Sequence, residues 1–206
     1  MIDIDLLLAW GATYKKVNRN EIIFYEGATA NFYHQLVQGR VRWVSIDEHG
    51  KEFIHMMVED GESFGEIPLF DNEPYAATAV ADEDSLLIRL HKSHFLALIH
   101  ENHSLHFDFS RLLAQRLRFR FLLVKELAMH SPEHKISSLL NYFKERNRHT
   151  CPDSNMVKLT RQQIADMTGL RVETVIRTIR YLRSSGKVSI EKGKVYCSND
   201  SLSLNR

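Results

Sequence analysis

The stretch LTRQQIADMTGLRVETVIRTIRYLRSSGKVSIEKGKVY, residues 159–196, carries the strongest structural signal in this chain. Thr160 is followed three residues later by Gln163, a capping-box pattern that predicts the start of a helix ending near Met167. Gly169 then predicts a tight turn, because glycine readily takes the left-handed backbone conformation that such turns need. The segment therefore begins as a helix followed by a sharp turn.

A second helix is expected after this turn, at 172–183, and Ser185-Gly186 marks its end. The order of Ala165, Gly169 and Val175 has the spacing of a helix-turn-helix, in which a small residue lets the two helices approach each other. Two short β-rich runs follow and predict a two-stranded wing, at 188–190 and 195–197. Together these features predict a winged helix-turn-helix.

The second helix presents Glu173 and Arg177 on one face, four residues apart. Arginine can contact guanine O6 and N7 together, and glutamate can accept a hydrogen bond from cytosine N4. The alternative is an exposed ion pair within the helix, worth about 0.3–0.5 kcal/mol; the surrounding winged helix favours DNA reading. Residues near the helix N-termini are candidates for phosphate contacts. The predicted DNA-contacting set is Thr160, Arg161, Gln162, Arg171, Val172, Glu173, Thr174 and Arg177.

Charge is distributed very unevenly along the chain. The 206 residues hold 27 Lys/Arg and 26 Asp/Glu, a net charge of +1, but residues 1–131 carry a net −6 and residues 132–206 a net +7. Such a split favours two domains with different partners, and the basic domain has the charge expected of a nucleic-acid binder.

The first half of the chain has the pattern of an all-β domain that continues to about residue 91. Five of the nine glycines fall at 27, 39, 50, 61 and 65, with short β-rich runs between them. A hairpin is expected around 48–50, and a further strand pair is expected at 76–80 and 85–89. The expected strands are 21–25, 32–37, 41–46, 53–58, 76–80 and 85–89.

The segment from Lys92 to Met129 contains no glycine or proline and predicts a short helix at 93–100 and a long one at 104–129. A seam recurs along the long helix at alternating spacings of four and three, which favours dimerisation through paired helices. It consists of Leu113, Leu117, Arg120, Val124 and Leu127. Other apolar residues are expected to pack against the β domain: Phe107, Phe109, Leu112, Phe119, Phe121, Leu122 and Leu123. A core helix of a single chain is the alternative.

Ser131 followed by Pro132 predicts a new helix at 133–146, because serine caps helices and proline is tolerated in the first turn. A hinge is therefore expected at 129–131. The expected organisation is a mixed α+β chain with a β-roll effector domain at 1–103, a dimerisation helix and hinge at 104–131, and a winged helix-turn-helix domain at 132–206.

Several classes of protein are excluded or disfavoured. Two cysteines, Cys151 and Cys197, are too few for a disulfide framework or a cysteine-ligated iron–sulfur cluster in one chain. No apolar run reaches the length of a membrane span, and the N-terminus lacks the basic start of a secretory signal, so a cytoplasmic location is expected. No catalytic motif and no metal-ligand motif is evident, so catalytic residues and a bound metal are not expected.

The chain resembles the CRP/FNR transcription regulators over nearly its whole length. The resemblance rests on Phe64-Gly65-Glu66 followed by Leu69-Phe70, on L-T-R-Q-x-I-A at 159–165 and on G-L-x-V-E-T-x-x-R at 169–177. It implies a homodimer that binds double-stranded palindromic DNA and acts on RNA polymerase. The V-E-T-x-x-R form resembles the FNR branch, with Ile176 where that branch usually has serine. By resemblance, Glu173 and Arg177 would read a G·C-containing, TGA-type half-site.

The resemblance also implies where an effector would bind. In cyclic-AMP-binding members an Arg-Ser pair holds the cyclic phosphate; here Tyr75 and Ala76 align with it. The family's Thr-Ser pair that contacts adenine aligns with Arg120 and Phe121. No Arg or Lys lies between Lys51 and Arg89, and a cyclic phosphate needs a positively charged partner, so cyclic AMP is not expected. The candidate effector pocket is Gly65, Glu66, Tyr75, Ala76, Arg120 and Phe121.

Two interpretations of this pocket stay open, and a cyclic-nucleotide-dependent or haem-dependent sensor of the same architecture is the alternative function. The aromatic side chains of the pocket fill it and hold the active arrangement without a ligand, or they line a site for an uncharged metabolite or haem. Haem would take its axial ligand from a group of histidines that lie before and on the long helix: His91, His94, His100, His103 and His106. The simpler explanation is that these histidines occupy solvated helix positions. Arg120, at a seam position, would contact an anionic ligand, pair with an acid such as Glu66, or set the register of the paired helices.

Overall fold

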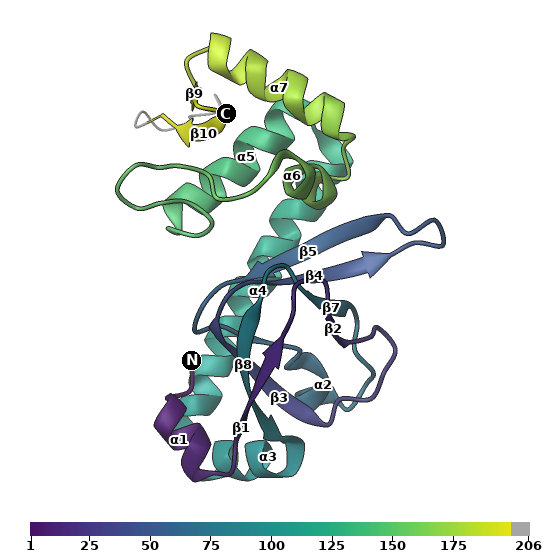
Figure 1. Cartoon of the computed structure of the whole chain (residues 1–206), viewed down its shortest axis with the longest axis vertical. Helices are drawn as coiled ribbons and strands as arrows, with labels where there is room; N and C mark the ends of the chain where they lie inside the picture. The colour runs from purple at the N-terminus through teal and green to yellow at the C-terminus, as the bar shows by residue number, and fades with distance from the viewer. Residues whose placement is uncertain (199–206) are drawn as a thin grey trace. The chain divides into compact units, whose positions relative to one another are not determined.

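The structure is a computed structural model that describes residues 1–198, apart from the side chain of Met129. The chain forms two compact units, Met1–Gln115 and Arg116–Arg206. The division falls inside one long helix, α4 (His103–Met129), so this helix contributes to both units (Figure 1). The boundaries expected at 103 and 131 stay predictions.

The first unit is a β-roll of two four-stranded antiparallel sheets, ordered β1-β8-β3-β6 and β2-β7-β4-β5 (Figure 1). This confirms the expected α+β fold with a β-roll. The strands are β1 (Thr13–Val17), β2 (Ile22–Phe24), β3 (Phe32–Gln38), β4 (Val41–Ile46), β5 (Glu52–Val58), β6 (Ser63–Phe64), β7 (Thr78–Ala81) and β8 (Ser85–His91). The hairpin expected around 48–50 joins β4 to β5. The sequence patterns did not indicate β1 or β6.

The expectation that the strands at 76–80 and 85–89 pair with each other is wrong. β7 pairs with β2 and β4, whereas β8 pairs with β1 and β3 in the other sheet. Both strands are largely buried and central in their sheets, so each has two neighbours already. The short link at 82–84 carries the chain from one sheet to the other.

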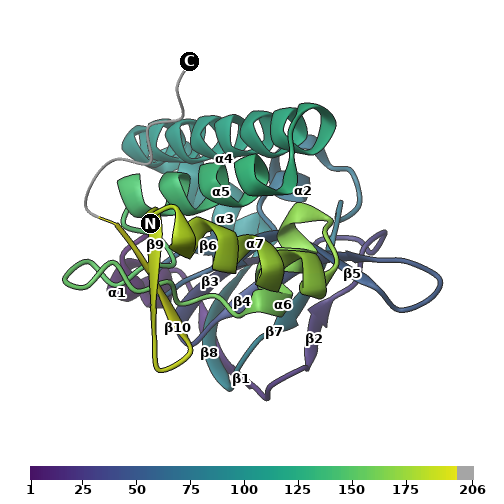
Figure 2. The ribbon, with the colours of Figure 1, turned by 90° about the horizontal axis from the view of Figure 1, so that it is seen from above.

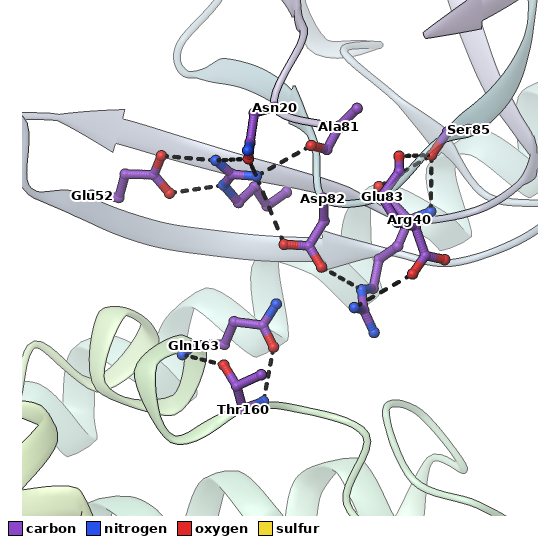
Figure 3. A network of polar contacts seen from close by, with 10 residues as sticks. Asn20, Arg40, Glu52, Ala81, Asp82, Glu83, Ser85, Thr160 and Gln163 are labelled. Atoms are coloured by element: carbon purple, nitrogen blue, oxygen red, sulfur yellow. Dashed lines mark hydrogen bonds and ion pairs between the residues drawn. The ribbon is translucent and has the colours of Figure 1, made fainter. Parts of the chain in front are cut away.

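Ion pairs hold this link against β4. The Nε of Arg40, just before β4, lies 2.7 Å from Oδ2 of Asp82, and the guanidinium of Arg42 on β4 lies 3.7 Å from Oδ1 of the same residue (Figure 3). A backbone N–H of Arg40 also donates to the hydroxyl of Ser85. Because these groups are only partly exposed, the pairs are screened less than surface salt bridges and fasten the crossing between the sheets.

Three short helices accompany the sheets: α1 (Ile4–Ala9), α2 (Ile67–Asp71) and α3 (Lys92–Glu101). Only α3 was expected, at 93–100. Its Phe95 stacks on Tyr33 with ring centroids 4.7 Å apart, and Phe109 of α4 meets both rings edge-on. The packing of Phe109 against the β domain is confirmed, but Phe107 is 65% exposed, contrary to expectation.

The second unit contains the helix-turn-helix and its wing. Its further elements are α5 (Pro132–Glu145), α6 (Arg161–Thr168), α7 (Val172–Ser184), β9 (Val188–Glu191) and β10 (Lys194–Cys197). Ser131 caps α5 and Pro132 stands in its first turn, as predicted. β9 and β10 pair as an antiparallel hairpin, the expected wing, drawn in yellow in Figure 2.

The C-terminal half of α4 has two different faces within this unit. Phe119 is buried and stacks on Tyr142 of α5 with ring centroids 4.8 Å apart. Leu117, Phe121 and Val124 are 56%, 68% and 62% exposed. Phe121 was expected to be buried against the β domain; it is exposed because helical periodicity puts it on the same face as the two seam residues.

The other seam residues, Leu113, Arg120 and Leu127, are half-buried. Among the helices within residues 1–198, none combines the length and the apolar character that crossing a membrane would need.

Candidate nucleic-acid interface and effector pocket

The turn between α6 and α7 is built by local bonds that the sequence pattern predicts. The Thr160 N–H donates to Oε1 of Gln163 at 2.9 Å, and the Gln163 N–H donates back to the Thr160 hydroxyl at 3.1 Å (Figure 3). Gly169 ends α6 at φ +65°, a conformation that favours glycine. Ala165 and Val175 are both buried where the helices meet. The helix-turn-helix is therefore a rigid support for α7.

α7 has one apolar and one polar face. Val175, Thr178, Ile179 and Leu182 are buried in the unit. Glu173 and Arg177 are exposed, and in the part of the chain that the structure describes they form no ion pair with each other. The simple alternative for this pair, an intrahelical salt bridge, is thus not the arrangement seen. Both side chains are available at the surface for base edges.

Arg177 has an electrostatic neighbour in the first turn of α5. The pKa of Glu133 is lowered from its usual value, chiefly by a hydrogen bond with the Ser131 side chain and its own backbone N–H, and also by the positive charge of Arg177. The start of α5 thus lies within electrostatic reach of the face of α7 that presents Arg177.

The candidates for phosphate contacts differ in the hydrogen bonds that their side chains make within the protein. Arg161 donates to the carbonyl of Gly193 in the wing at 2.9 Å, and burial lowers its pKa. Gln162 donates to Oδ1 of Asp166 at 2.8 Å. Arg171 immediately precedes α7 and is exposed, so its guanidinium stands at the N-terminus of this helix where it can reach a phosphate.

Val172 and Thr174 lie half-buried in the first turn of α7, and Thr160 is exposed. Sequence reasoning missed Arg180, which is exposed and follows Arg177 by three residues on the same side of α7. The signal was present in the sequence as the repeated arginines of RTIRYLR. The roles assigned to all these residues stay predictions.

The candidate effector pocket is crowded by aromatic rings in the first unit. Tyr75 is 4% exposed and stacks on Phe24 with ring centroids 3.7 Å apart and planes 8° from parallel. A Cβ added to Gly65, whose φ is +70°, would lie 2.7 Å from Phe24 and 3.0 Å from Tyr75. Burial raises the pKa of the Tyr75 hydroxyl to about 12. Only glycine fits where these two rings meet.

The other predicted pocket residues are less closely grouped. Glu66 is fully buried, and Ala76 is exposed although its neighbour Tyr75 is buried. Arg120 and Phe121 belong to the second unit. Arg120 is half-buried, and burial together with the charge of Arg116 lowers its pKa. A pocket that joins the two sets, and a pairing of Arg120 with Glu66, stay predictions.

His34 is a buried histidine that sequence reasoning missed. It lies on β3 among aromatic rings, with centroids 5.4 Å from Phe64 and 5.6 Å from Phe24. Burial, with the charges of Arg89 and Lys15, lowers its pKa from 6.5 to about 3. Its position in the β-rich run FYHQLV, directly after two aromatic residues, was the available signal. The ring is neutral at physiological pH and acts as part of the core.

We expect His34 to make the protein less stable in mild acid. In the unfolded chain the His34 imidazole binds a proton below pH 6.5, whereas in the folded chain it stays neutral down to about pH 3. The protonation of His34 therefore does not affect the free energy of unfolding above pH 6.5. Below pH 6.5 it lowers that free energy by about 1.4 kcal/mol per pH unit, or about 2 kcal/mol by pH 5. Urea unfolding at pH 7.5 and pH 5, at one fixed protein concentration, measures this loss.

His34→Phe is expected to remove that part of the acid sensitivity, because it has no group to protonate. His94→Phe, at an exposed position on α3, serves as the control and should keep it. Equal acid sensitivity in the wild type and His34→Phe would contradict the assignment.

The five histidines considered for haem all lie at the surface. His91, His94, His100, His103 and His106 are exposed in the structure. His91 accepts a hydrogen bond from the Ser93 N–H and caps α3. These positions favour solvated helix histidines over axial ligands, which need an enclosing apolar pocket.

Two family models match the chain. The cyclic nucleotide-binding domain matches residues 14–102, and the Crp-like helix-turn-helix domain matches residues 134–200. The cAMP-activated global transcriptional regulator CRP of Pasteurella multocida is 29% identical to the chain over 90% of its length and 91% of the relative. The cyclic AMP receptor protein of Thermus thermophilus is also 29% identical, over 94% and 87%.

The structure of FixK2 from Bradyrhizobium japonicum superposes with a TM-score of 0.78 at 21% identity, and covers 91% of this chain and 93% of that one. This likeness shows the fold. The curated relatives named here are transcription regulators rather than enzymes. With both domain models in the expected order and a complete winged helix-turn-helix, the chain belongs to the CRP/FNR family of transcription regulators.

Proposed function

We propose that this protein is a homodimeric transcription regulator that reads a two-fold symmetric DNA site with one α7 from each subunit and needs no cyclic AMP. RNA polymerase is its proposed protein partner. The observation that carries the proposal is the exposed face of α7, where Glu173 and Arg177 are not paired with each other. A cytoplasmic location is supported by the proposed target, which is duplex DNA, and by the two cysteines, Cys151 and Cys197, which form no disulfide.

Exposed apolar side chains on α4 support the dimer. Leu117, Phe121 and Val124 stand four and three residues apart and are each more than half exposed. An apolar stripe with this period on a 27-residue helix fits the same stripe of a second copy, as in a two-stranded coiled coil. A second copy of this chain is therefore the proposed occupant of this face.

The stack of Phe24 and Tyr75 over Gly65 supports a pocket filled by the protein itself. Where a bound nucleotide would need a positively charged partner for its phosphate, the aligned residue is the buried ring of Tyr75. Arg89 carries a positive charge near His34, but its guanidinium lies over the ring of Phe32 at 4.7 Å. The aromatic rings occupy the space and supply no compensating charge.

We expect calorimetric titration with millimolar cyclic AMP to give no heat beyond dilution. The physical reason is that a full negative charge would have to leave water without a cationic partner. Purified protein without any additive is expected to bind its DNA site measurably. Tight cyclic-AMP binding would overturn the filled pocket, and an absolute requirement for a ligand would overturn ligand-independent DNA binding.

Sequence selection from random duplex DNA, with purified ligand-free protein, tests the proposed function as a whole. The expected product is a two-fold symmetric site whose G·C-containing half-sites lie about one helical turn, or ~34 Å, apart. An absorption spectrum of the same sample, examined for a Soret band, tests for haem. Failure to enrich any symmetric sequence would refute the proposed DNA target.

A further inference from the structure

Three potential metal ligands meet where α4 ends and α5 begins. Glu126 lies in the last turn of α4, His130 in the connection and His134 in the first turn of α5. One ligand atom from each side chain lies within 4.8 Å of the other two. Nε2 of His134 is 3.5 Å from Oε2 of Glu126, and the rings of His130 and His134 stack with centroids 4.0 Å apart. All three belong to the second unit.

Two of these side chains bury polar atoms that lack a hydrogen bond. Glu126 is 6% exposed, and among the described residues, 1–198 without the Met129 side chain, its Oε2 has no hydrogen-bond partner. Nε2 of His130 is buried and has none within that same set. The ammonium of Lys135, a residue that lines the same small cavity as Glu126, donates instead to the carbonyl of Leu127 at 3.1 Å. Buried polar atoms are normally satisfied, so these atoms call for a ligand.

We propose that Glu126, His130 and His134 bind one divalent first-row transition-metal ion, with zinc as the representative. Two imidazole nitrogens and one carboxylate oxygen form a donor set that zinc accepts, with water in the fourth position. Ligand bonds of about 2.0–2.2 Å put tetrahedral ligand atoms about 3.3 Å apart. The His134–Glu126 separation is already close to this, and binding requires the ligand atom of His130, which lies within 4.8 Å of the other two, to move closer.

The site joins two helices at the hinge. Ser131 caps α5, and the Lys135 N–H donates to the Ser131 carbonyl, so the backbone around the site is already ordered. A metal held by the last turn of α4 and the first turn of α5 stabilises one angle between these helices. α5 packs directly against α7 in the same unit. The proposed site therefore lies at the start of the helix that supports the DNA-reading helix.

Metal titration of the untagged full-length protein, after treatment with a chelator, tests the site. We expect one Zn²⁺ per chain by calorimetry, and for Co²⁺ the intense visible absorption of a tetrahedral complex. His130→Ala/His134→Ala is expected to abolish both signals. Glu126→Gln keeps the shape of the side chain and is expected to weaken Zn²⁺ binding at least about tenfold.

The matched control is His103→Ala/His106→Ala. It removes two histidines that are exposed, lie three residues apart and belong to the same helix, α4. It is expected to bind Zn²⁺ like the wild type. Circular dichroism checks folding, and Glu126→Gln alone decides if the double variant does not fold. The site is overturned if no stoichiometric Zn²⁺ or Co²⁺ binds, or if Glu126→Gln binds as tightly as the wild type.

Discussion

Glutamate at both Leu117 and Val124 is expected to convert the dimer into monomers. The two residues are 56% and 62% exposed in the single chain, so the substitutions should leave the folded subunit intact. In the dimer they would place four carboxylates in an apolar seam, and each buried, unpaired charge costs several kcal/mol. Light scattering coupled to size exclusion measures the mass, and a persistent dimer would refute the seam.

The matched control is Arg118→Glu/Lys125→Glu, which also puts two glutamates seven residues apart on exposed positions of α4. These positions lie one residue beyond the seam, about 100° around the helix, so the dimer is expected to remain. DNA binding provides a second measurement. The Leu117/Val124 variant should lose affinity for a symmetric site because its two half-sites are no longer bound together.

Arg177→Ala is expected to cost about 1–3 kcal/mol of binding free energy per half-site, because it removes a bidentate contact to guanine. A dimer carries the substitution twice, so about 2–6 kcal/mol is lost on the selected site if the half-sites contribute independently. Binding to random DNA should change much less. Competition binding on the selected site and on a variant with that guanine replaced measures the loss of specificity.

Arg171→Ala is the comparison, because this exposed arginine stands just before α7 and is assigned to a phosphate. It should weaken all sequences alike and reduce the slope of affinity against salt by about one per subunit. Arg161 is a poorer choice, since its guanidinium also holds the wing through Gly193. Identical effects of Arg177→Ala and Arg171→Ala on specific and random DNA would show the assigned roles to be wrong.

The DNA-binding unit could be predicted almost residue by residue from the sequence. The cap of α6, its end at Gly169 and the start of α5 at Ser131 all depend on bonds between residues a few positions apart. Such local chemistry is written in the order of the residues, so spacing alone identifies it. The hairpins around 48–50 and of the wing could be predicted for the same reason.

Long-range pairing could not be predicted in this way. β7 and β8 are consecutive and both β-rich, yet each pairs with strands from distant parts of the chain. Phe24 and Tyr75 are far apart in sequence, and it is the pairing of β2 with β7 that brings their rings to 3.7 Å. The family resemblance implied that an uncharged tyrosine, Tyr75, replaces the arginine that holds the cyclic phosphate. It did not imply that the ring of Tyr75 stacks on Phe24.

The sequence by itself determined the winged helix-turn-helix, the family and the arginine-bearing face of α7, because caps, turns and helical period act over a few residues. Helical periodicity groups the apolar residues of α4 into faces, and tertiary packing decided which face is covered: Phe119 meets Tyr142, while Phe121 stays exposed beside Leu117 and Val124. Tertiary packing also brought Glu126, His130 and His134 together. Their spacing of four residues would group them on one face of a continuous helix, but α4 ends at Met129 and α5 begins at Pro132, so helical periodicity does not hold across the break. The tertiary arrangement of the two helices therefore decides that the three side chains meet.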